Sequence, residues 1–314
     1  MSDDRPAWDR EGRDWPNRES SAFVVAGGLR WHVQRMGDPA RHPTALLLHG
    51  TASATHSWRD LAPMLVARGF ATVAPDLPGH GFTSAPPRDG AALTLPGMAA
   101  SVRALLAALG GARPEVAVGH SAGAAVALRM ALDGAISPRL VVALNGALVP
   151  IGRANADLFS GAARLLAGMS FVPRLFAWRA ASDARVAERL LRDTGSSLDA
   201  RGVDLYARLI RRPGHLAAAL GMMAAWDLRP LLRDLPRLRA ALALVVGERD
   251  RTIPPDDARR VRAVLPSARI VPLPGLGHLA HEERPAEVAD LIARLAREAA
   301  APGDATRPAA TANA

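Results

Sequence analysis

The chain has 314 residues, of which 49% are hydrophobic and 22% are charged, as in a soluble globular protein with a sizeable core. It has no cysteine and its nine histidines lack metal-ligand spacing, which argues against disulfides, a thiol nucleophile, a bound metal or another cofactor. The net charge of +9 is carried by arginines spread among acidic neighbours, with no lysine, so a nucleic-acid partner is not expected.

The N-terminus opens with acidic residues and lacks the apolar stretch of a secretory signal. No apolar run approaches the roughly 18 residues that a membrane span needs, so we expect a cytoplasmic protein with no membrane span. Residues 1–19 are predicted to be an N-terminal arm, whose Trp8 and Trp15 either dock a partner or pack onto the edge of a sheet. The end of the chain, residues 301–314, is rich in Ala, Pro and Thr and is predicted to be a disordered tail.

Alternating segments within residues 22–35 flank Gly27 and Gly28, which predicts a β-hairpin at an antiparallel edge. Short apolar runs then alternate with helical patterns, as in βαβ units, which predicts an α/β fold with a mostly parallel, twisted sheet and helices on both faces. The apolar runs cover residues 44–50, 70–76, 115–120, 140–146, 241–250 and 268–273. The helical patterns cover residues 57–69, 101–110, 121–134 and 285–300.

The strand pattern stops between residues 147 and 236, where helical spacing is punctuated by Gly and Pro. We interpret residues 147–236 as a helical cap inserted over the C-terminal edge of the sheet, and residues 20–146 and 237–300 as the core that it covers. The helical segments of this cap are predicted within residues 157–168, 183–193 and 205–226.

The segment Gly119-His120-Ser121-Ala122-Gly123 fits the G-x-S-x-G pattern and lies between a predicted strand and a helix predicted over residues 122–131. A sharp strand-to-helix turn strains the backbone of the serine, and the residues two positions away must lack side chains to avoid a clash. The turn would present the Ser121 hydroxyl at the top of the sheet, near a helix N-terminus. We therefore predict that Ser121 is a nucleophile.

A serine nucleophile needs a base, and the base needs an orienting carboxylate. Asp250 follows a predicted strand and His278 lies in a glycine-bearing loop after the next one, which makes them the predicted acid and base. The order serine, acid, histidine is that of the α/β-hydrolase fold. Glu248 and His281 are the alternatives; Glu248 should still lie on or near its strand, and His281 is expected to be a surface or capping histidine.

An oxyanion hole needs backbone N–H donors, usually one after the nucleophile and one from the loop after the third strand. Ala122 is predicted to supply the first donor and Thr51 the second. His80 and His120 lie close to these motifs in sequence and are expected to be structural.

Five motifs resemble the α/β-hydrolase superfamily over residues 20–300: "LLLHGTAS", "APDLPGHGFT", "GHSAG", "GERD" and "GLGHLAHEERP". Longer strings, including "HGTASATHSWRDLAP" and "LYARLIRRPGHLAAALGMMAAWDL", are similar to the magnesium-chelatase accessory α/β-hydrolases of bacteriochlorophyll biosynthesis clusters. The resemblance implies a role in chlorophyll-type pigment synthesis for photosynthesis, and a contact with magnesium chelatase. Haloalkane dehalogenases and epoxide hydrolases have aspartate at the nucleophile position, so Ser121 argues against both activities.

The predicted cap brings arginines close in sequence to an apolar segment. Such a pocket would suit a flat hydrophobic ligand with carboxylates, such as a tetrapyrrole or its ester. The alternative is that these residues form the core face and the solvated face of one amphipathic cap helix. The residues concerned are Arg208, Arg211, Arg212, Met222, Met223 and Trp226.

The sequence thus predicts a serine hydrolase that acts on an ester or related acyl bond of a small molecule. One alternative is a non-catalytic accessory or tetrapyrrole-binding protein that assists magnesium chelatase. Another keeps Ser121, His278 and Asp250 but uses them for cofactor-free perhydrolysis or carbon–carbon cleavage, which the sequence does not separate from ester hydrolysis.

Overall fold

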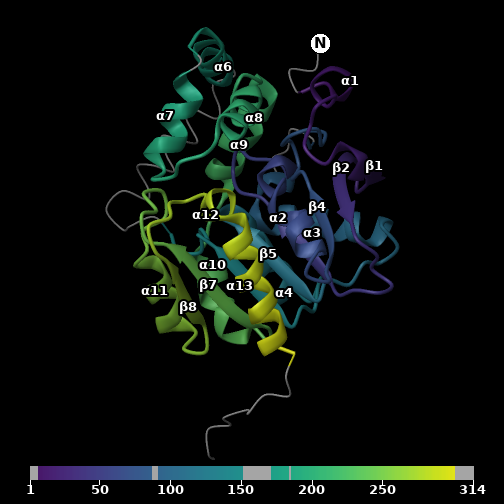
Figure 1. The fold of residues 1–314 in the computed structure, drawn as a ribbon, viewed down its shortest axis with the longest axis vertical. Coiled ribbons are helices and arrows are strands. Elements are labelled where there is room, and N and C mark those ends of the chain that lie inside the picture. Colours follow the sequence, from purple (N-terminus) through teal and green to yellow (C-terminus); the bar gives the residue numbers. More distant parts are fainter. Residues whose placement is uncertain (1–5, 87–90, 151–170, 184, 301–314) are drawn as a thin grey trace, which may run out of the picture.

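The computed structural model describes residues 6–86, 91–150, 171–183 and 185–300, and their fold is shown in Figure 1. An eight-stranded sheet with the order β1-β2-β4-β3-β5-β6-β7-β8 lies between two layers of helices. This confirms the predicted α/β-hydrolase fold. The strands are β1 (Ser21–Ala26), β2 (Leu29–Met36), β3 (Thr44–Leu48), β4 (Ala71–Pro75), β5 (Val116–His120), β6 (Leu140–Leu144), β7 (Ala241–Gly247) and β8 (Arg269–Leu273).

The antiparallel edge is a hairpin of β1 and β2, and β2 also pairs antiparallel with β4. Its turn is Gly27-Gly28, whose φ angles of 56° and 76° are ones that glycine adopts without steric cost. The neighbouring pairs from β4 through β3, β5, β6 and β7 to β8 are parallel. The carboxyl ends of these parallel strands therefore share one edge of the sheet.

Both faces of the parallel strands are buried, which explains their continuous apolar sequences. One face packs against α3 (Leu95–Ala108), α4 (Ala122–Leu132) and α11 (Asp257–Val264), and the other against α2 (Leu61–Val66) and α13 (Pro285–Glu298). These two apolar layers hold the sheet in place, so that residues at its carboxyl edge have fixed positions.

Helices between β6 and β7 form the cap region. They are α6 (Val172–Ser182), α7 (Arg185–Asp193), α8 (Ala200–Ile210), α9 (Pro213–Ala225) and α10 (Arg229–Asp234). Figure 1 shows α6 to α9 gathered at one end of the molecule, whereas α10 lies beside the sheet. Leu231 of α10 belongs to the same apolar cluster as α4, so this helix joins the core layer although the sequence places it in the cap. The predicted helix within residues 157–168 and the predicted tail at 301–314 lie outside the described residues.

The N-terminal arm, with the short helix α1 (Trp8–Glu11), packs over the antiparallel edge of the sheet. The Trp8 ring lies 4.9 to 5.4 Å from the rings of Phe23, His32 and Phe82. Trp15 is buried and its indole N–H donates to Thr55 Oγ1 at 3.0 Å. Of the two alternatives, the structure shows packing onto the sheet for Trp8, which contacts Phe23 of β1 and His32 of β2, whereas Trp15 packs against Thr55 and Phe82 outside the strands. In the described parts of the chain, no helix combines the length and the apolar character needed to cross a bilayer.

Candidate active site

Ser121 lies at a sharp turn between β5 and α4, with φ 50° and ψ −116°, a conformation that is strained for a residue with a side chain. The two glycines of the motif make the turn possible. A Cβ on Gly119 would overlap the backbone of Ala124, and a Cβ on Gly123 would overlap the carbonyl oxygen of Leu48 on β3. The strand, the turn and the helix therefore approach one another more closely than any larger residue would permit.

Backbone hydrogen bonds hold the strained turn in position. The Ser121 N–H donates to the Leu144 carbonyl at the end of β6, and the Ser121 carbonyl accepts from the Ala147 N–H, each at 3.0 Å. The serine is 8% exposed, and no hydrogen-bond partner of its hydroxyl is found within the described residues. The hydroxyl is thus held on a fixed backbone and is free to bond to another group.

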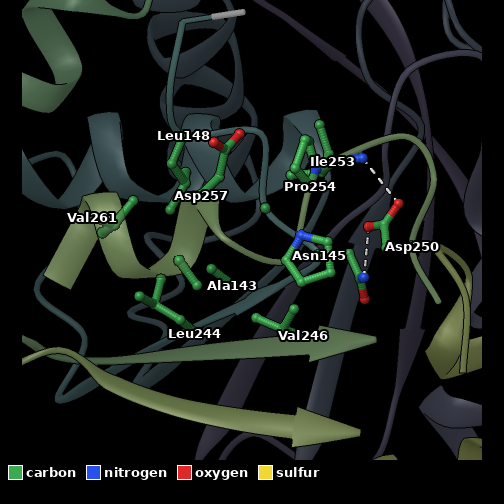
Figure 2. Close-up of a pocket in the computed structure, with 13 residues that line it drawn as sticks. Ala143, Asn145, Leu148, Leu244, Val246, Asp250, Ile253, Pro254, Asp257 and Val261 are labelled. Atoms are coloured by element: carbon green, nitrogen blue, oxygen red, sulfur yellow. Dashed lines mark hydrogen bonds between the residues drawn. The ribbon is translucent and has the colours of Figure 1, made fainter. Parts of the chain in front are cut away.

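Asp250 and His278 meet at the ends of neighbouring strands, with His278 Nδ1 2.8 Å from Asp250 Oδ2. The same oxygen accepts from Asn145 Nδ2 at 2.7 Å, and Oδ1 accepts from the backbone N–H groups of Thr252 and Ile253 at 2.7 and 2.9 Å. Figure 2 shows Asp250 between Asn145 and Ile253. Four donors around one buried carboxylate fix its orientation.

A small cavity of about 20 Å³ lies beside this carboxylate, between β6, β7 and the start of α11. Asn145 and Asp250 contribute its polar lining, together with Asp257, and the rest is apolar. Asn145 Oδ1 is buried and lacks a hydrogen-bond partner within the described residues. The volume is enough for one water molecule, which could satisfy that oxygen.

The two alternatives to this acid and base have other surroundings. Glu248 is exposed, and the carboxylate that reaches His278 is that of Asp250. His281 is 1% exposed, and its ring packs 4.8 Å from the Trp58 ring. The expectation that His281 is a surface or capping histidine is therefore wrong: the residue is the second of a short helix, α12 (Ala280–Glu283), and its side chain is buried in the core.

Several polar groups support the loop that carries His278. His120 Nε2 donates to the His278 carbonyl at 3.0 Å. The N–H of Gly277 donates to the Glu283 carboxylate at 2.8 Å, and the N–H of Leu279 donates to the Ser196 hydroxyl at 2.8 Å. Because Ser196 lies between α7 and α8, the cap takes part in fixing this loop.

The loop after β3 lies against the elbow. A Cβ on Gly50 would stand 3.1 Å from Ser121 Cβ, so Thr51, the next residue, follows directly beside the nucleophile position. Ala122 is the first residue of α4 and its N–H therefore has no acceptor inside that helix. This arrangement is compatible with the predicted donors, whose role stays a prediction.

The arginines of the predicted cap pocket have partners within the chain. Arg208 contacts both carboxylate oxygens of Asp14 in the N-terminal arm, at 2.7 and 2.9 Å, and Arg212 contacts Glu11 at 2.6 Å. Arg211 donates to the Ala180 carbonyl of α6 at 3.4 Å. A ligand carboxylate would have to displace the arm from Arg208 and Arg212.

The apolar members of that predicted pocket are also dispersed. Met222 is buried in the main core, Met223 is exposed, and the indole N–H of Trp226 donates to the Leu93 carbonyl at 2.9 Å. The segment expected as one amphipathic helix is two helices, α8 and α9, because Pro213 begins the second one. The three apolar residues thus lie in three different environments.

Buried histidines surround the site, and burial lowers the pKa of each below the usual value for the imidazole. They are His49, His56, His80, His120, His215, whose pKa is about 4, and His281, whose pKa is about 3. They are neutral at physiological pH. Across the described ranges, no group of three or more histidine, aspartate or glutamate side chains is arranged so that it could hold a metal ion.

Three residues of the site were missed by sequence reasoning. Asn145 directly follows a fully buried strand next to the strand of Asp250, which is a signal that could have been used. Tyr206 of α8 and Glu282 of α12 make a hydrogen bond across 76 positions of sequence. No local pattern indicates that contact.

A family model described as "Alpha/beta hydrolase family" matches residues 45–291. The chain belongs to the α/β-hydrolase family. It is 38% identical over 269 residues to the magnesium-chelatase 30 kDa subunit of Rhodobacter capsulatus, covering 86% of this chain and 92% of that protein. It is 26% identical over 291 residues to the 2-hydroxy-6-oxo-6-phenylhexa-2,4-dienoate hydrolase of Burkholderia cepacia, covering 88% and 94%.

Solved structures agree with this assignment. An α/β-hydrolase fold protein from Burkholderia ambifaria superposes with a TM-score of 0.70 at 22% identity, over 86% of this chain and 96% of that one. At this identity the likeness concerns the fold alone. The resemblance indicated by the motifs is thus confirmed, both to the superfamily and to the relatives associated with magnesium chelatase. This α/β-hydrolase has hydrolases and a magnesium-chelatase subunit among its relatives.

Proposed function

We propose that the protein is a serine hydrolase that cleaves an ester or related acyl bond, with Ser121 as nucleophile, His278 as base and Asp250 as the group that orients His278. One observation carries this proposal: the 2.8 Å contact of Asp250 with His278 Nδ1 leaves Nε2 of that ring for the serine, which stands on a strained turn. Family membership supports it, since a hydrolase is among the relatives.

The proposed reaction is described by the transfer of one proton. Ser121 Oγ attacks the acyl carbon while its proton passes to His278 Nε2, and Asp250 stabilises the imidazolium that forms. The N–H groups of Thr51 and Ala122 hold the oxyanion. When the intermediate collapses, the leaving group takes the proton from Nε2. A water molecule, deprotonated by the same nitrogen, then releases the acyl group from Ser121.

The substrate class is proposed from the comparisons and not from the pocket. The similarity to a magnesium-chelatase subunit supports a cytoplasmic role in bacteriochlorophyll synthesis, with a tetrapyrrole or its ester as the small-molecule substrate and magnesium chelatase as a neighbour. The structure adds one limit: Arg208 and Arg212 are engaged by the N-terminal arm, so they are poor candidates for the groups that bind its carboxylates.

The first experiment is intact-mass spectrometry after exposure to a fluorophosphonate, which reacts with activated serines. We expect one adduct on the wild-type protein and none on Ser121→Ala. Ser101→Ala is the matched control, because this serine bonds only to the Gly97 carbonyl of its own helix and should leave the adduct in place. A folded wild-type protein that takes up no label would reject the proposal.

A second function deserves a test because the relative with 38% identity is named as a subunit of magnesium chelatase. In this alternative the protein assists the chelatase without using Ser121. The Ser121→Ala variant is added to purified chelatase, and metal insertion into a porphyrin is followed by absorbance. Stimulation equal to that by the wild type would favour the accessory function, and its loss in the variant would favour the hydrolase.

A further inference from the structure

Tyr206, the only tyrosine of the chain, lies on α8 of the cap and is buried. Its hydroxyl donates to Glu282 Oε1 at 2.7 Å and lies 3.2 Å from Ser53 Oγ. A phenol has one proton, which it donates in the hydrogen bond to Glu282. The phenolic oxygen therefore accepts a hydrogen bond from the Ser53 hydroxyl, which gives a chain of donors that runs from Ser53 through Tyr206 to Glu282.

Both partners belong to elements that carry the proposed machinery. Ser53 follows Thr51 by two residues, and its N–H donates to the Gly50 carbonyl at 3.3 Å, so it moves with the loop that approaches Ser121. Glu282 lies on α12, which begins two residues after His278. One hydroxyl thus joins the loop of the proposed oxyanion donor to the element that follows the proposed base.

The surroundings make these two hydrogen bonds important. Tyr206 packs with the apolar side chains of Leu191 and Leu279, and the Glu282 side chain is only 1% exposed. A buried hydroxyl or carboxyl group that loses its hydrogen-bond partner cannot recover the bond from solvent. The hydrogen bonds from Ser53 to Tyr206 and from Tyr206 to Glu282 therefore hold one geometry, and breaking either of them costs free energy.

The protonation state of Glu282 agrees with this description. Burial raises the pKa of its carboxyl group to about 8, so the group is neutral at pH 7. The titratable groups that act on it are Tyr206 from α8, His281, whose Nε2 is 3.9 Å from Oε1, and, farther along, Arg59, Asp60 and Asp199. Burial and Glu282 also raise the pKa of the Tyr206 hydroxyl, so no part of the chain of donors carries charge.

We propose that Tyr206 is a positioning residue, whose hydroxyl fixes the distance between the loop of Thr51 and the loop of His278 and so makes the reactive geometry depend on the cap. This inference rests on the proposed function. Because α8 supplies the hydroxyl, the cap cannot move away without breaking both hydrogen bonds. The second cap contact with the same loop, from Ser196 to the Leu279 N–H, acts in the same direction.

The test measures the rate of fluorophosphonate labelling of Ser121 as a function of reagent concentration, which separates reagent affinity from the limiting rate. Tyr206→Phe removes one oxygen and keeps the ring. We expect its limiting rate to fall about tenfold with little change in reagent affinity, because the base and the oxyanion donors lose their relative position. A residue that only stabilises the fold would leave the limiting rate of the folded protein unchanged.

Two further variants test the other members of this chain of hydrogen bonds, and the lower limiting rate expected of Ser53→Ala alone keeps the proposal testable if Tyr206→Phe does not fold. Glu282→Gln retains an acceptor oxygen for the phenol and should lose less of the limiting rate than Tyr206→Phe. Ser53→Ala should lower the limiting rate alone, but should add nothing when combined with Tyr206→Phe, because its effect passes through the phenolic oxygen.

The single tyrosine also gives a spectroscopic test. Replacement by 3-fluorotyrosine places one fluorine nucleus beside this hydrogen bond, and we expect its ¹⁹F resonance to shift when Ser121 is phosphonylated. If the wild-type protein is labelled and Tyr206→Phe has the same limiting rate, the inference is wrong while the proposed function stands. The same holds if the ¹⁹F resonance does not shift when Ser121 is phosphonylated. An unlabelled wild-type protein would overturn the proposed function and the inference together.

Discussion

Two aspartates of this protein each accept several hydrogen bonds, but in opposite environments. The Asp250 side chain is 0% exposed, and its donors are two backbone N–H groups, an amide and an imidazole. The Asp14 side chain is 53% exposed, and its donors are the arginines Arg201 and Arg208. Hydrogen bonding to Arg208, followed by the other arginine contacts, holds the pKa of the Asp14 carboxyl well below its usual range.

The comparison shows that the number of hydrogen bonds does not measure how much a site depends on them. Around Asp250 each donor is held in place by the fold beside a fully buried carboxylate, so the loss of one donor is costly. Around Asp14 the donors are long side chains in contact with solvent, which can rearrange and be screened by salt. Four predictions, in order of decreasing effect, test this difference.

The largest effect is expected when a side chain is added where the turn at Ser121 packs closely against β3. Gly123→Ala would place a methyl group onto the Leu48 carbonyl oxygen of β3, which cannot move without displacing the strand. We expect a loss of about 4 kcal/mol or more in unfolding free energy, measured by urea denaturation. Gly110→Ala is the control: its φ of 85° is one that alanine rarely adopts, but a Cβ there meets nothing within 4 Å. Equal losses in both variants would contradict the steric explanation.

The second prediction concerns Glu282, a buried carboxyl group that no arginine neutralises by direct contact. Its pKa is about 8 in the folded protein and 4.5 as the reference value, so between these values the folded state holds one more proton than the unfolded state. Stability must therefore fall as pH rises through this window and level off above it. The buried histidines have lowered pKa values and give the opposite slope, which fades only as pH rises above their unfolded-state pKa of about 6.5.

The difference in stability between the wild type and Glu282→Gln isolates the carboxyl group, because the histidines contribute equally to both proteins. We expect the unfolding free energy of the wild type to fall by up to about 2 kcal/mol relative to that of Glu282→Gln between pH 6.5 and pH 8. Urea unfolding of both proteins at the two pH values measures this difference. A difference that is the same at both pH values would show that the carboxyl group is already ionised at pH 6.5.

The sequence was sufficient for those parts of the fold whose determinants are local. Continuous apolar runs identified the buried strands, and the two glycines beside Ser121 identified the turn, because a clash two residues away is visible in sequence. The pairing of Asp250 with His278 could be expected from their positions at strand ends, and their roles as acid and base stay a prediction. These rules describe contacts within one element or at a shared edge of the sheet.

Contacts between distant elements were not predictable in this way. The arginines Arg208 and Arg212 were assigned to a ligand pocket because the sequence does not show that Asp14 and Glu11 lie beside them. His281 was expected at the surface, since its burial depends on the packing of α12 against Trp58. Charge and hydrophobicity along one helix do not reveal which neighbour it meets.

The third prediction tests a single donor to the buried aspartate. Asn145→Ala removes the amide from Asp250 Oδ2, so the carboxylate that orients His278 loses one of its four donors. We expect the rate of fluorophosphonate labelling to fall by about 10- to 30-fold. Asn17→Ala, which also removes one amide hydrogen bond, to the Arg59 carbonyl, is the control and should label at the wild-type rate. Equal rates in the two variants would mean that the amide does not help to hold Asp250.

The smallest effect is expected in the exposed region. Asp14→Asn weakens the contacts with Arg201 and Arg208, and because half of the carboxylate faces solvent we expect a loss of only about 0.2–1 kcal/mol in unfolding free energy. This loss of unfolding free energy should shrink further in 1 M salt, where exposed charges are screened. The loss of labelling rate in Asn145→Ala should persist there. The variant also separates two roles for Arg208. If this arginine serves only to hold the arm, fluorescence quenching by a carboxylated porphyrin should give the same affinity for Asp14→Asn as for the wild type. Tighter binding would mean that the arm competes with the ligand, and the arginines would then belong to the substrate site after all.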